Sequence, residues 1–567
     1  MQRTGAQIVW ESLVKEGVTT VFGYPGGAIL PTYDAMLDYS VHHVLVRHEQ
    51  GAAHMADGYA RASGKVGVAI ATSGPGATNL TTGIATAMLD SSPTVFITGQ
   101  VSSKVLGSDA FQETDVTGIT LPITKHNSLV TDVRQIARTM REAFVIARSG
   151  RPGPVLVDIT KDAQQATTDF VYPETVHLPG LHEPEPPDAE SLARAAELIQ
   201  KAERPLILAG AGVIRSGASQ ALIEFAENAQ IPVALTLLGI GGFPQSHPLC
   251  LGMMGMHGEA FVNSAIQRAD LLLAFGMRFD DRVTGNLKTY AVHAKKIHVE
   301  IDASEIGKNV KVDVALVSDL LAALKSLGPI VPKKRHDAWL AEIEKGRAET
   351  RSRDIIHKDS DGQLLAPHVM HDLWKTTGGG SVIVTDVGQH QMWEAQYYKH
   401  DAPRTLITSG GLGTMGFALP AAIGAKFGRP DAEVWVVAGD GGFQMTQCEL
   451  ATLQQERLDV KIAVINNGFL GMVRQWQEFF HHKRYAATPM LSPDFVKLAA
   501  AYDIPAHRVR SRGDVAPVVQ QARETKGPVL IEFQVEKEEA VYPMVPAGSD
   551  LHAMIRRPAE ENAEVRS

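Results

Sequence analysis

The sequence predicts an α/β protein made of three domains, each with a doubly wound parallel sheet. Short apolar runs typical of buried strands alternate with helical patterns along most of the chain. Such alternation is typical of parallel sheets that carry helices on both faces. A length of 567 residues exceeds what one hydrophobic core supports, and domains of ~150 to 200 residues would number about three.

Two stretches of different composition separate the three α/β segments. Residues 171–188 are rich in proline and acidic side chains and predict a linker, and residues 328–367 form a polar, charged helical connector. The expected domains are an N-terminal one over 1–168, a central one over 189–327 and a C-terminal one over 368–540, followed by a tail over 541–567. The tail could be a mobile lid or a disordered end.

The expected strands are short apolar runs bounded by turn residues. They cover residues 20–22, 44–46, 66–71, 94–98 and 155–159, then 206–209, 233–235, 271–275 and 296–301, and finally 382–385, 433–438 and 460–465. The sequence shows no internal repeat, although two of the three segments could share a fold.

Composition excludes several classes of protein. A hydrophobic share of 44% and a charged share of 21% fit a globular enzyme. The net charge of −9 and the lack of a basic block argue against nucleic acid as a partner. Cys250 and Cys448 are too few and too distant for a disulfide framework or a metal site. An amphipathic helix begins at about residue 8 and no apolar run reaches the ~20 residues of a membrane span, so a cytoplasmic location is expected.

Gly439-Asp440-Gly441 and Asn466-Asn467 end two consecutive predicted strands, with a helix predicted over 446–457 between them. In a βαβ unit both strand ends reach the edge of the sheet where ligands bind. A carboxylate and an amide oxygen there suit Mg²⁺ bridged to two phosphates, and the glycines let the backbone approach. Either motif alone could be an ordinary turn, but their spacing favours the metal site.

At these residues the chain resembles the thiamine diphosphate enzymes. The resemblance implies that Asp440, Asn467 and the carbonyl of Phe469 hold the Mg²⁺. It also implies a cofactor groove in which Met415 bends thiamine diphosphate so that its two rings meet. The other residues of that groove would be Val387, Gly388, Gln389, His390, Gly413, Gly441 and Gly442.

Glu49 stands where a predicted strand passes into a helix. Thiamine chemistry needs a carboxylate beside the aminopyrimidine ring, because a proton on one ring nitrogen makes the exocyclic amine basic enough to activate the thiazolium carbon. Glu49 could instead stabilise the start of its helix. The resemblance implies the cofactor role, and it implies that Glu49 and the metal motif meet across a subunit interface, so that a dimer is the minimum active unit.

Gly210 and Gly212 follow a predicted strand, but Arg215 stands where a dinucleotide fingerprint needs a third glycine, so an NAD site is weakly supported. From the run 22–27 (FGYPGG) to the region of 541–543 (VYP), the chain closely resembles the catalytic large subunits of the acetohydroxyacid synthase (acetolactate synthase) family. That family binds FAD in its central domain although no electrons are transferred overall. The resemblance implies FAD contacts at Arg151, Gly210, Gly212, His257, Gly276, Arg278, Asp280, Val283, Glu300 and Asp319.

The resemblance implies decarboxylation of pyruvate and ligation of the two-carbon unit to pyruvate or 2-ketobutyrate, giving 2-acetolactate or 2-aceto-2-hydroxybutyrate for branched-chain amino acids. Arg282 could hold the acceptor carboxylate, or pair with Asp280 or Asp281. Trp476, on a predicted helix, could contact the extra methylene of 2-ketobutyrate, or be a core residue. By resemblance, Phe111, Gln112, Lys161 and Met256 line the substrate channel.

Two other functions remain open from the sequence. A pyruvate oxidase that uses thiamine diphosphate and FAD would share the fold, and a catalytically silent binding subunit would keep it as a scaffold. The intact Glu49, Asp440 and Asn467 argue against the second. The family resemblance also implies a homodimer or homotetramer and allows a separate small regulatory subunit.

Overall fold

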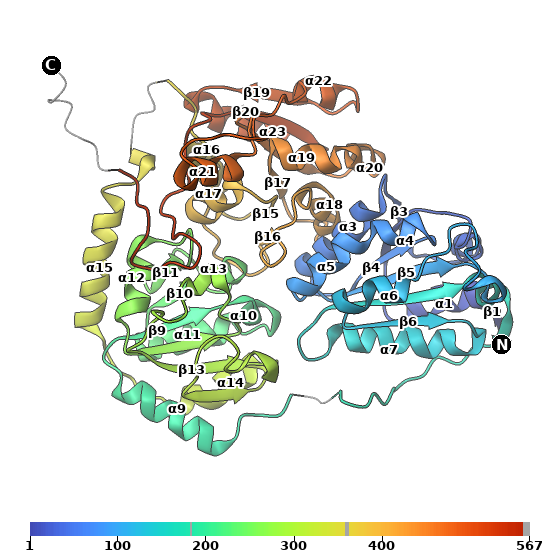
Figure 1. Ribbon diagram of the computed structural model, residues 1–567, viewed down its shortest axis with the longest axis horizontal. Coiled ribbons are helices and arrows are strands. Elements are labelled where there is room, and N and C mark those ends of the chain that lie inside the picture. Colours follow the sequence, from blue (N-terminus) through green and yellow to red (C-terminus); the bar gives the residue numbers. More distant parts are fainter. Residues whose placement is uncertain (182–183, 358–361, 559–567) are drawn as a thin grey trace.

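Three six-stranded parallel sheets form the framework of the protein (Figure 1). The computed structural model describes residues 1–181, 184–357 and 362–558. Each sheet lies within one of the three predicted segments, and hydrophobic clusters pack on both of its faces, one cluster being shared by the N-terminal and C-terminal sheets. The predicted fold class is therefore confirmed, while the end points of the predicted domains stay predictions.

The N-terminal sheet has the strand order β3-β2-β4-β5-β7-β6. Its strands are β2 (Thr20–Gly23), β3 (His42–Leu45), β4 (Gly67–Ala71), β5 (Thr94–Gln100), β6 (His126–Val130) and β7 (Pro154–Thr160), and β1 (Gln2–Thr4) pairs with β8 (Thr167–Asp169) in a small antiparallel sheet. Its helices are α1 (Gly5–Lys15), α2 (Leu30–Ala35), α3 (Glu49–Ser63), α4 (Pro75–Asn79), α5 (Thr81–Leu89), α6 (Val116–Thr120), α7 (Ile136–Arg148) and α8 (Lys161–Gln165).

The central sheet has the order β11-β10-β9-β12-β13-β14. Its strands are β9 (Pro205–Ala209), β10 (Val233–Leu235), β11 (Cys250–Met253), β12 (Leu271–Phe275), β13 (Lys295–Glu300) and β14 (Val314–Val317). Its helices are α9 (Ala189–Lys201), α10 (Ala211–Arg215), α11 (Ser219–Ala229), α12 (Ala260–Arg268), α13 (Asp281–Thr284) and α14 (Leu320–Leu327), and α15 (Asp337–Arg351) in the connector packs against α12.

The C-terminal sheet has the order β16-β15-β17-β18-β20-β19. Its strands are β15 (Val382–Thr385), β16 (Leu406–Thr408), β17 (Val434–Gly439), β18 (Val460–Asn466), β19 (Ala506–Val509) and β20 (Val529–Gln534). Its helices are α16 (Ala366–Thr377), α17 (Gln389–Tyr397), α18 (Ala418–Gly428), α19 (Asp440–Thr446), α20 (Leu450–Gln455), α21 (Gly471–Phe480), α22 (Phe495–Ala500) and α23 (Val515–Glu524).

The N-terminal and C-terminal domains share one topology. When the six parallel strands of each domain are counted from its start, both sheets have the order 2-1-3-4-6-5. The central sheet has the order 3-2-1-4-5-6, which is the order of dinucleotide-binding folds. In such a sheet ligands bind beyond the carboxyl ends of the strands at the point where the order reverses, which here lies between β9 and β12.

Helices α3 and α18 join the two domains of like topology, and residues of both domains share one hydrophobic core. Gly58 and Gly424 make the contact close, because a Cβ at either position would collide with the backbone of the opposite helix. The start of α3, which carries Glu49, and the cofactor loops of the C-terminal domain are thus parts of one rigid packing unit.

The helix predicted over 446–457 is wrong in its start and its continuity. Helix α19 begins earlier, at Asp440, and a 3₁₀ turn over Gln447–Glu449 separates it from α20. Gly441 and Gly442 therefore belong to a first helical turn rather than to a loop. The reason is their position directly after β17, where the chain turns sharply back from the sheet edge.

The predicted linker and tail differ in character. Among the described residues, no helix or strand lies between β8 and α9, as the linker prediction requires, and Figure 1 shows this stretch running along the lower side of the molecule. The described part of the tail packs on the central domain, where Val545 N donates to Met256 O at 2.8 Å. The tail prediction for residues 559–567 lies outside the described residues.

Within the described ranges, every helix is too short or too polar to cross a membrane.

Candidate cofactor and active site

Asp440 and Asn467 lie at the same edge of the C-terminal sheet, because β17 and β18 pair in parallel up to Gly439 and Ile465. Asp440 is 1% exposed, and one of its oxygens accepts a 2.7 Å bond from Ser492 Oγ. Burial raises the pKa of Asp440 to about 6. A cation beside this carboxylate would offset the cost of burying its charge, so the residue fits the predicted Mg²⁺.

The turn after β18 supplies neutral oxygens. Gly468 has φ +68°, a left-handed conformation that lets Asn467 Oδ1 accept from Phe469 N at 3.1 Å. No cluster of three or more His, Cys, Asp and Glu side chains suited to a metal occurs in the described part of the chain. A metal here would combine the single carboxylate of Asp440 with amide and carbonyl oxygens, as in the predicted ligand set.

Of the predicted residues, Val387 and Gly388 lie in the turn from β15 to α17, and Gln389 and His390 begin α17. His390 is buried, and its Nε2 has no hydrogen-bond partner among the described residues. Burial lowers the pKa of His390 to about 4, so the ring is neutral at neutral pH. An unpartnered ring nitrogen in the first turn of a helix that follows Gly388, at φ +152°, fits a diphosphate oxygen.

Gln389 contacts the turn that carries the predicted metal ligands. Its Oε1 accepts from Asn467 Nδ2 at 3.3 Å, and its Nε2 donates to Gln475 Oε1 at 2.9 Å. Gln475 in turn contacts the tail through Val541 N at 2.8 Å. Gln389 therefore supports the metal turn from behind and links it to the tail, while Val387 and Gly388 face the main cavity.

Asp386 is a buried acid that sequence reasoning missed. Its carboxylate accepts from Val387 N and Gly416 N, both at 2.8 Å, and burial raises its pKa to about 7. A Cβ on Gly442 would lie 2.7 Å from that carboxylate. Asp386 thus holds the loop that ends at Gly416 against the first turn of α19. The sequence could have indicated Asp386 as a site residue, since it directly follows a predicted strand at the edge of the sheet where ligands bind.

Glu49 begins α3 and is 9% exposed. Its Oε2 accepts from Asn79 Nδ2 at 2.9 Å. A Cβ on Gly76 would lie 3.3 Å from Glu49 Oε1, and one on Gly74 would lie 2.8 Å from the carbonyl of Gln112. Glu49 and Gln112 therefore border one glycine-containing turn of the N-terminal domain, the turn between β4 and α4.

A large cavity of about 1020 Å³ lies between the three domains. All ten predicted FAD residues line it, namely Arg151, Gly210, Gly212, His257, Gly276, Arg278, Asp280, Val283, Glu300 and Asp319. Gly210 and Gly276 stand at the ends of β9 and β12, the reversal point of the central sheet. A Cβ on Gly212 would lie 2.6 Å from the Cα of Gly276, so the two turns touch.

The same cavity is lined by Met415 and Gly413 from the C-terminal domain and by the predicted acceptor residues Met256, Arg282 and Trp476. The guanidinium of Arg282 lies 3.6 Å from Asp281, but both side chains are more than half exposed, and such a pair contributes little. Asp280 instead caps α13 by accepting from the backbone N of Arg282 at 3.1 Å.

Trp476 lies on α21, as predicted, where it is partly exposed and faces the cavity, so the core interpretation is wrong. Its ring packs on Phe480 with the centroids 5.4 Å apart.

Four predicted residues of the N-terminal domain do not line this cavity: Glu49, Phe111, Gln112 and Lys161. Phe111 is 89% exposed, an unusual state for a phenylalanine. The predicted metal ligands Asp440, Asn467 and Phe469 do not line it either, but Met415 reaches the first turn of α19, where a Cβ on Gly441 would lie 3.6 Å from Met415 Cε. The site residues thus form two groups, one around Glu49 and one around Met415 and the metal turn.

Sequence profiles of known families match all three domains. Residues 3–119 match the family described as thiamine pyrophosphate enzyme, N-terminal TPP binding domain; residues 192–327 match its central domain, and residues 386–533 its C-terminal TPP binding domain. Three such domains in this order define a thiamine pyrophosphate enzyme.

The relatives narrow that class. The acetolactate synthase large subunit of Corynebacterium glutamicum is 49% identical over 560 residues, which is 96% of this chain and 89% of that protein. A probable acetolactate synthase large subunit of Methanocaldococcus jannaschii is 46% identical over 97% of this chain and 95% of its own length. The chloroplastic acetolactate synthase 1 of Nicotiana tabacum is 45% identical over 96% of this chain and 84% of its own length. The chain belongs to the acetolactate synthase family of thiamine pyrophosphate enzymes.

Proposed function

We propose that this chain is the catalytic subunit of an acetolactate synthase that joins the two-carbon unit of pyruvate to a second 2-ketoacid. With pyruvate as acceptor, two pyruvates and one proton give 2-acetolactate and CO₂. With 2-ketobutyrate the product is 2-aceto-2-hydroxybutyrate. The observation that carries the proposal is that Met415 of the thiamine half-site, Arg282 and Trp476 line one cavity, in a chain of this family.

Thiamine diphosphate, when bound, supplies the carbon that adds to the keto group and accepts the electron pair released with CO₂. Asp440, Asn467 and Phe469 O would hold Mg²⁺, and His390 would donate to the diphosphate. Glu49 would hold the proton on the aminopyrimidine nitrogen. Its low exposure keeps water from that carboxylate.

The acceptor is selected by the residues that face the cavity from the central and C-terminal domains. The guanidinium of Arg282 offers two parallel N–H groups to the acceptor carboxylate and so orients its keto carbon. Trp476 and Met256 present apolar surface beside it. Burial of one extra methylene is worth ~0.8 kcal/mol, so 2-ketobutyrate would bind about fourfold more tightly than pyruvate from this contact alone.

The flavin proposal rests on the central sheet. Its strand order, the touching turns at Gly212 and Gly276, and the ten residues that line the cavity support FAD at the reversal point. No group in the reaction needs to gain or lose electrons overall, so the role proposed for FAD is structural. A pyruvate oxidase would instead reduce the flavin with pyruvate, which absorbance at the flavin band would detect.

A dimer with shared sites is supported by the two separate groups of site residues. Glu49 and Gln112 do not line the cavity that Met415 lines, so a second copy would bring its Glu49 to that cavity. The exposed ring of Phe111 would be covered in the same step. A tetramer, a regulatory subunit and the cytoplasmic location stay predictions.

The direct test is product analysis with purified protein, pyruvate, thiamine diphosphate, Mg²⁺ and FAD. Acetolactate is expected as the main product, with acetaldehyde and acetyl phosphate minor. Arg282→Met should raise the KM for the acceptor and divert the two-carbon unit to acetaldehyde. Glu16→Gln, a change at a side chain that pairs with Arg141 and Arg148 and does not itself line the cavity, is the control that should leave the products unchanged. Absence of acetolactate from the unmodified protein would refute the proposal.

A further inference from the structure

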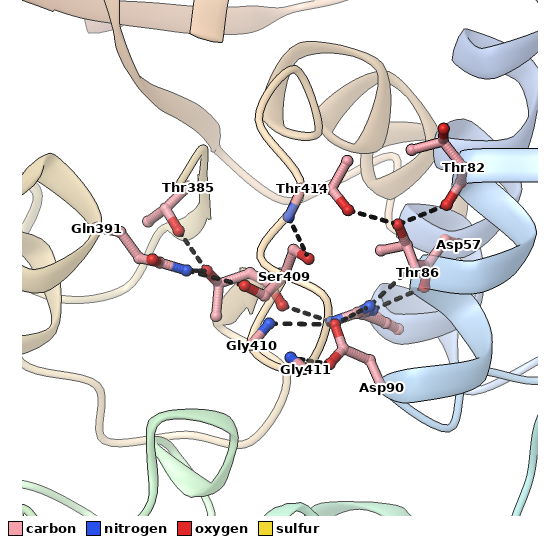
Figure 2. A network of polar contacts seen from close by, with 12 residues as sticks. Asp57, Thr82, Thr86, Asp90, Thr385, Gln391, Ser409, Gly410, Gly411 and Thr414 are labelled. Atoms are coloured by element: carbon pink, nitrogen blue, oxygen red, sulfur yellow. Dashed lines mark hydrogen bonds and ion pairs between the residues drawn. The ribbon is translucent and has the colours of Figure 1, made fainter. Parts of the chain in front are cut away.

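The loop 409–416, which carries Gly413 and Met415, is held by the N-terminal domain of its own chain (Figure 2). The carboxylate of Asp90, at the end of α5, accepts from the backbone N of Gly410 at 3.2 Å and of Gly411 at 2.6 Å. Asp90 is 1% exposed. A Cβ on Gly411 would lie only 2.8 Å from Asp90 Oδ1, so the two backbones could not approach this closely with a larger residue.

Arg61 on α3 fixes the carboxylate of Asp90 from the other side. Its Nη2 donates to Asp90 Oδ2 at 2.8 Å, and its Nη1 donates to the carbonyl of Thr408 at 2.6 Å, just before the loop. A second buried acid, Asp57, accepts from Arg61 Nε at 2.7 Å. Burial alone would lower the pKa of Arg61, but Asp57 and Asp90 together raise it, so the guanidinium stays charged.

A hydroxyl pair adds a third connection between the domains. Thr86 Oγ1 donates to Thr82 O at 2.8 Å and lies 2.7 Å from Thr414 Oγ1, so the hydroxyl of Thr414 is the donor in that pair. The backbone N of Thr414 donates to Ser409 Oγ at 3.0 Å across the loop. Polar contacts therefore fix the loop at Gly410 and Gly411, near its start, and at Thr414, near its end.

The central domain reaches the same point. Arg215, which replaces the third glycine of a dinucleotide fingerprint, donates to the carbonyl of Asp90. Arg151 of the N-terminal domain, a predicted FAD contact, donates from Nε to Ser91 Oγ at 2.8 Å and from Nη1 to Glu305 Oε1 of the central domain at 2.9 Å. Asp90 and Ser91 also line the large cavity. Asp90 and Ser91 thus contact Arg215 and Arg151 beside the proposed FAD site, and Asp90 also contacts loop 409–416 of the proposed thiamine diphosphate site.

We propose that Asp90, with Arg61, is a positioning residue that holds loop 409–416 in the shape in which Met415 faces the cavity. The inference rests on the proposed thiamine diphosphate site, because the loop matters through Gly413 and Met415. A buried carboxylate that serves only stability would need no partners in the loop of another domain. Here two of its three partners are N–H groups of that loop.

The test measures binding of thiamine diphosphate with Mg²⁺ by calorimetry, in the FAD-loaded protein, for Asp90→Ala, Asp90→Asn and Glu16→Gln. Glu16 is the matched control: its side chain is 2% exposed, belongs to the same domain and pairs with Arg141 and Arg148 rather than with the loop. Without Asp90, binding of the cofactor must itself order the loop. Every 1.4 kcal/mol of that ordering cost weakens the affinity for thiamine diphosphate tenfold.

Asp90→Ala is expected to bind thiamine diphosphate roughly tenfold or more weakly. Asp90→Asn should lie between, since its single oxygen can accept from one of the two glycines, and Glu16→Gln should match the unmodified protein. In activity assays, the apparent dissociation constant for thiamine diphosphate should rise by a larger factor than that by which kcat at saturating cofactor falls. Affinity within twofold of the unmodified protein in both Asp90 variants, or an equal loss in Glu16→Gln, would overturn the inference. If the unmodified protein made no acetolactate while Asp90→Ala still lost affinity, the proposed function would fail and this inference would stand.

Discussion

Glu449 of the C-terminal domain anchors the segment from which Glu49 projects, and its replacement gives a prediction that can be worked from distances. Glu449 is fully buried. Its Oε1 accepts from Arg47 N and His48 N, both at 3.1 Å, and its Oε2 accepts from Thr452 Oγ1 at 2.6 Å. Arg47 and His48 directly precede α3, so this one carboxylate fixes the start of the helix.

Glu449→Gln keeps the shape of the side chain but replaces one accepting oxygen with a donating NH₂ group. At least one hydrogen bond to a charged group is lost, at ~1.5 to 3 kcal/mol, and a buried donor is left unpaired. Burial also raises the pKa of Glu449, so part of that loss is offset because the charge no longer has to be buried. We expect the local free energy of opening at residues 45–50 to fall by about 2 kcal/mol, which makes amide exchange about 30-fold faster.

Hydrogen exchange with mass spectrometry, read on peptides that cover residues 45–50, measures this directly. Glu394→Gln is the matched control, because Glu394 is equally buried in the same domain but contacts His400 and not α3. Turnover should fall about tenfold in Glu449→Gln as Glu49 loses its position. Unchanged exchange at 45–50 in Glu449→Gln, or equal acceleration in Glu394→Gln, would show that the carboxylate does not hold the helix start.

Three further predictions concern single residues. Asp440→Ala should weaken the Mg²⁺-dependent affinity for thiamine diphosphate about 100-fold, which corresponds to a loss of ~3 kcal/mol in binding free energy. Calorimetry would measure this loss, and visible absorbance should show that the flavin content is unchanged. Gly442→Ala should unfold at a lower temperature, because the new methyl group would lie 2.7 Å from the Asp386 carboxylate; a melting curve equal to that of the unmodified protein would contradict this. Burial lowers the pKa of His54 from 6.5 to about 4, so the unfolded chain binds the extra proton between these values and stability should fall as pH falls from 6.5 to 4. In His54→Gln that decline should be shallower in pH-dependent melting.

The strands that sequence patterns missed are mostly the edge strands. Five of them, β6, β11, β14, β16 and β19, stand at the edges of the three sheets. An edge strand pairs on one side only and needs no continuous apolar run; β6, for example, has a single buried residue, Val130. Two more, β1 and β8, form the small antiparallel pair, and β20 lies inside its sheet, where its apolar run over 529–533 carried a usable signal.

The site divides in the same way into local and long-range parts. Asp440 and Asn467 could be predicted because each directly follows a strand, and the topology then brings the strand ends together. Asp90 and Glu449 could not, because each acts on backbone N–H groups more than 300 residues away in the chain. Backbone groups leave no trace in a pattern of side chains, so contacts of this kind emerge only when the domains are packed.

The packing of α3 on α18 couples the contacts of Glu449 and Asp90 to one another. The start of α3 presents Glu49, and Arg61 near its end holds the loop that leads to Met415. Both positions belong to one rigid helix, so a change that tilts α3 against α18 must disturb both half-sites of the chain at once. Because the proposed dimer pairs the Glu49 of one chain with the Met415 loop of the other, each α3 would contribute to both active sites, through its first turn to one and through Arg61 to the other. Substitutions at Gly58, where α3 touches α18, should therefore damage both sites of a dimer even when only one chain carries them.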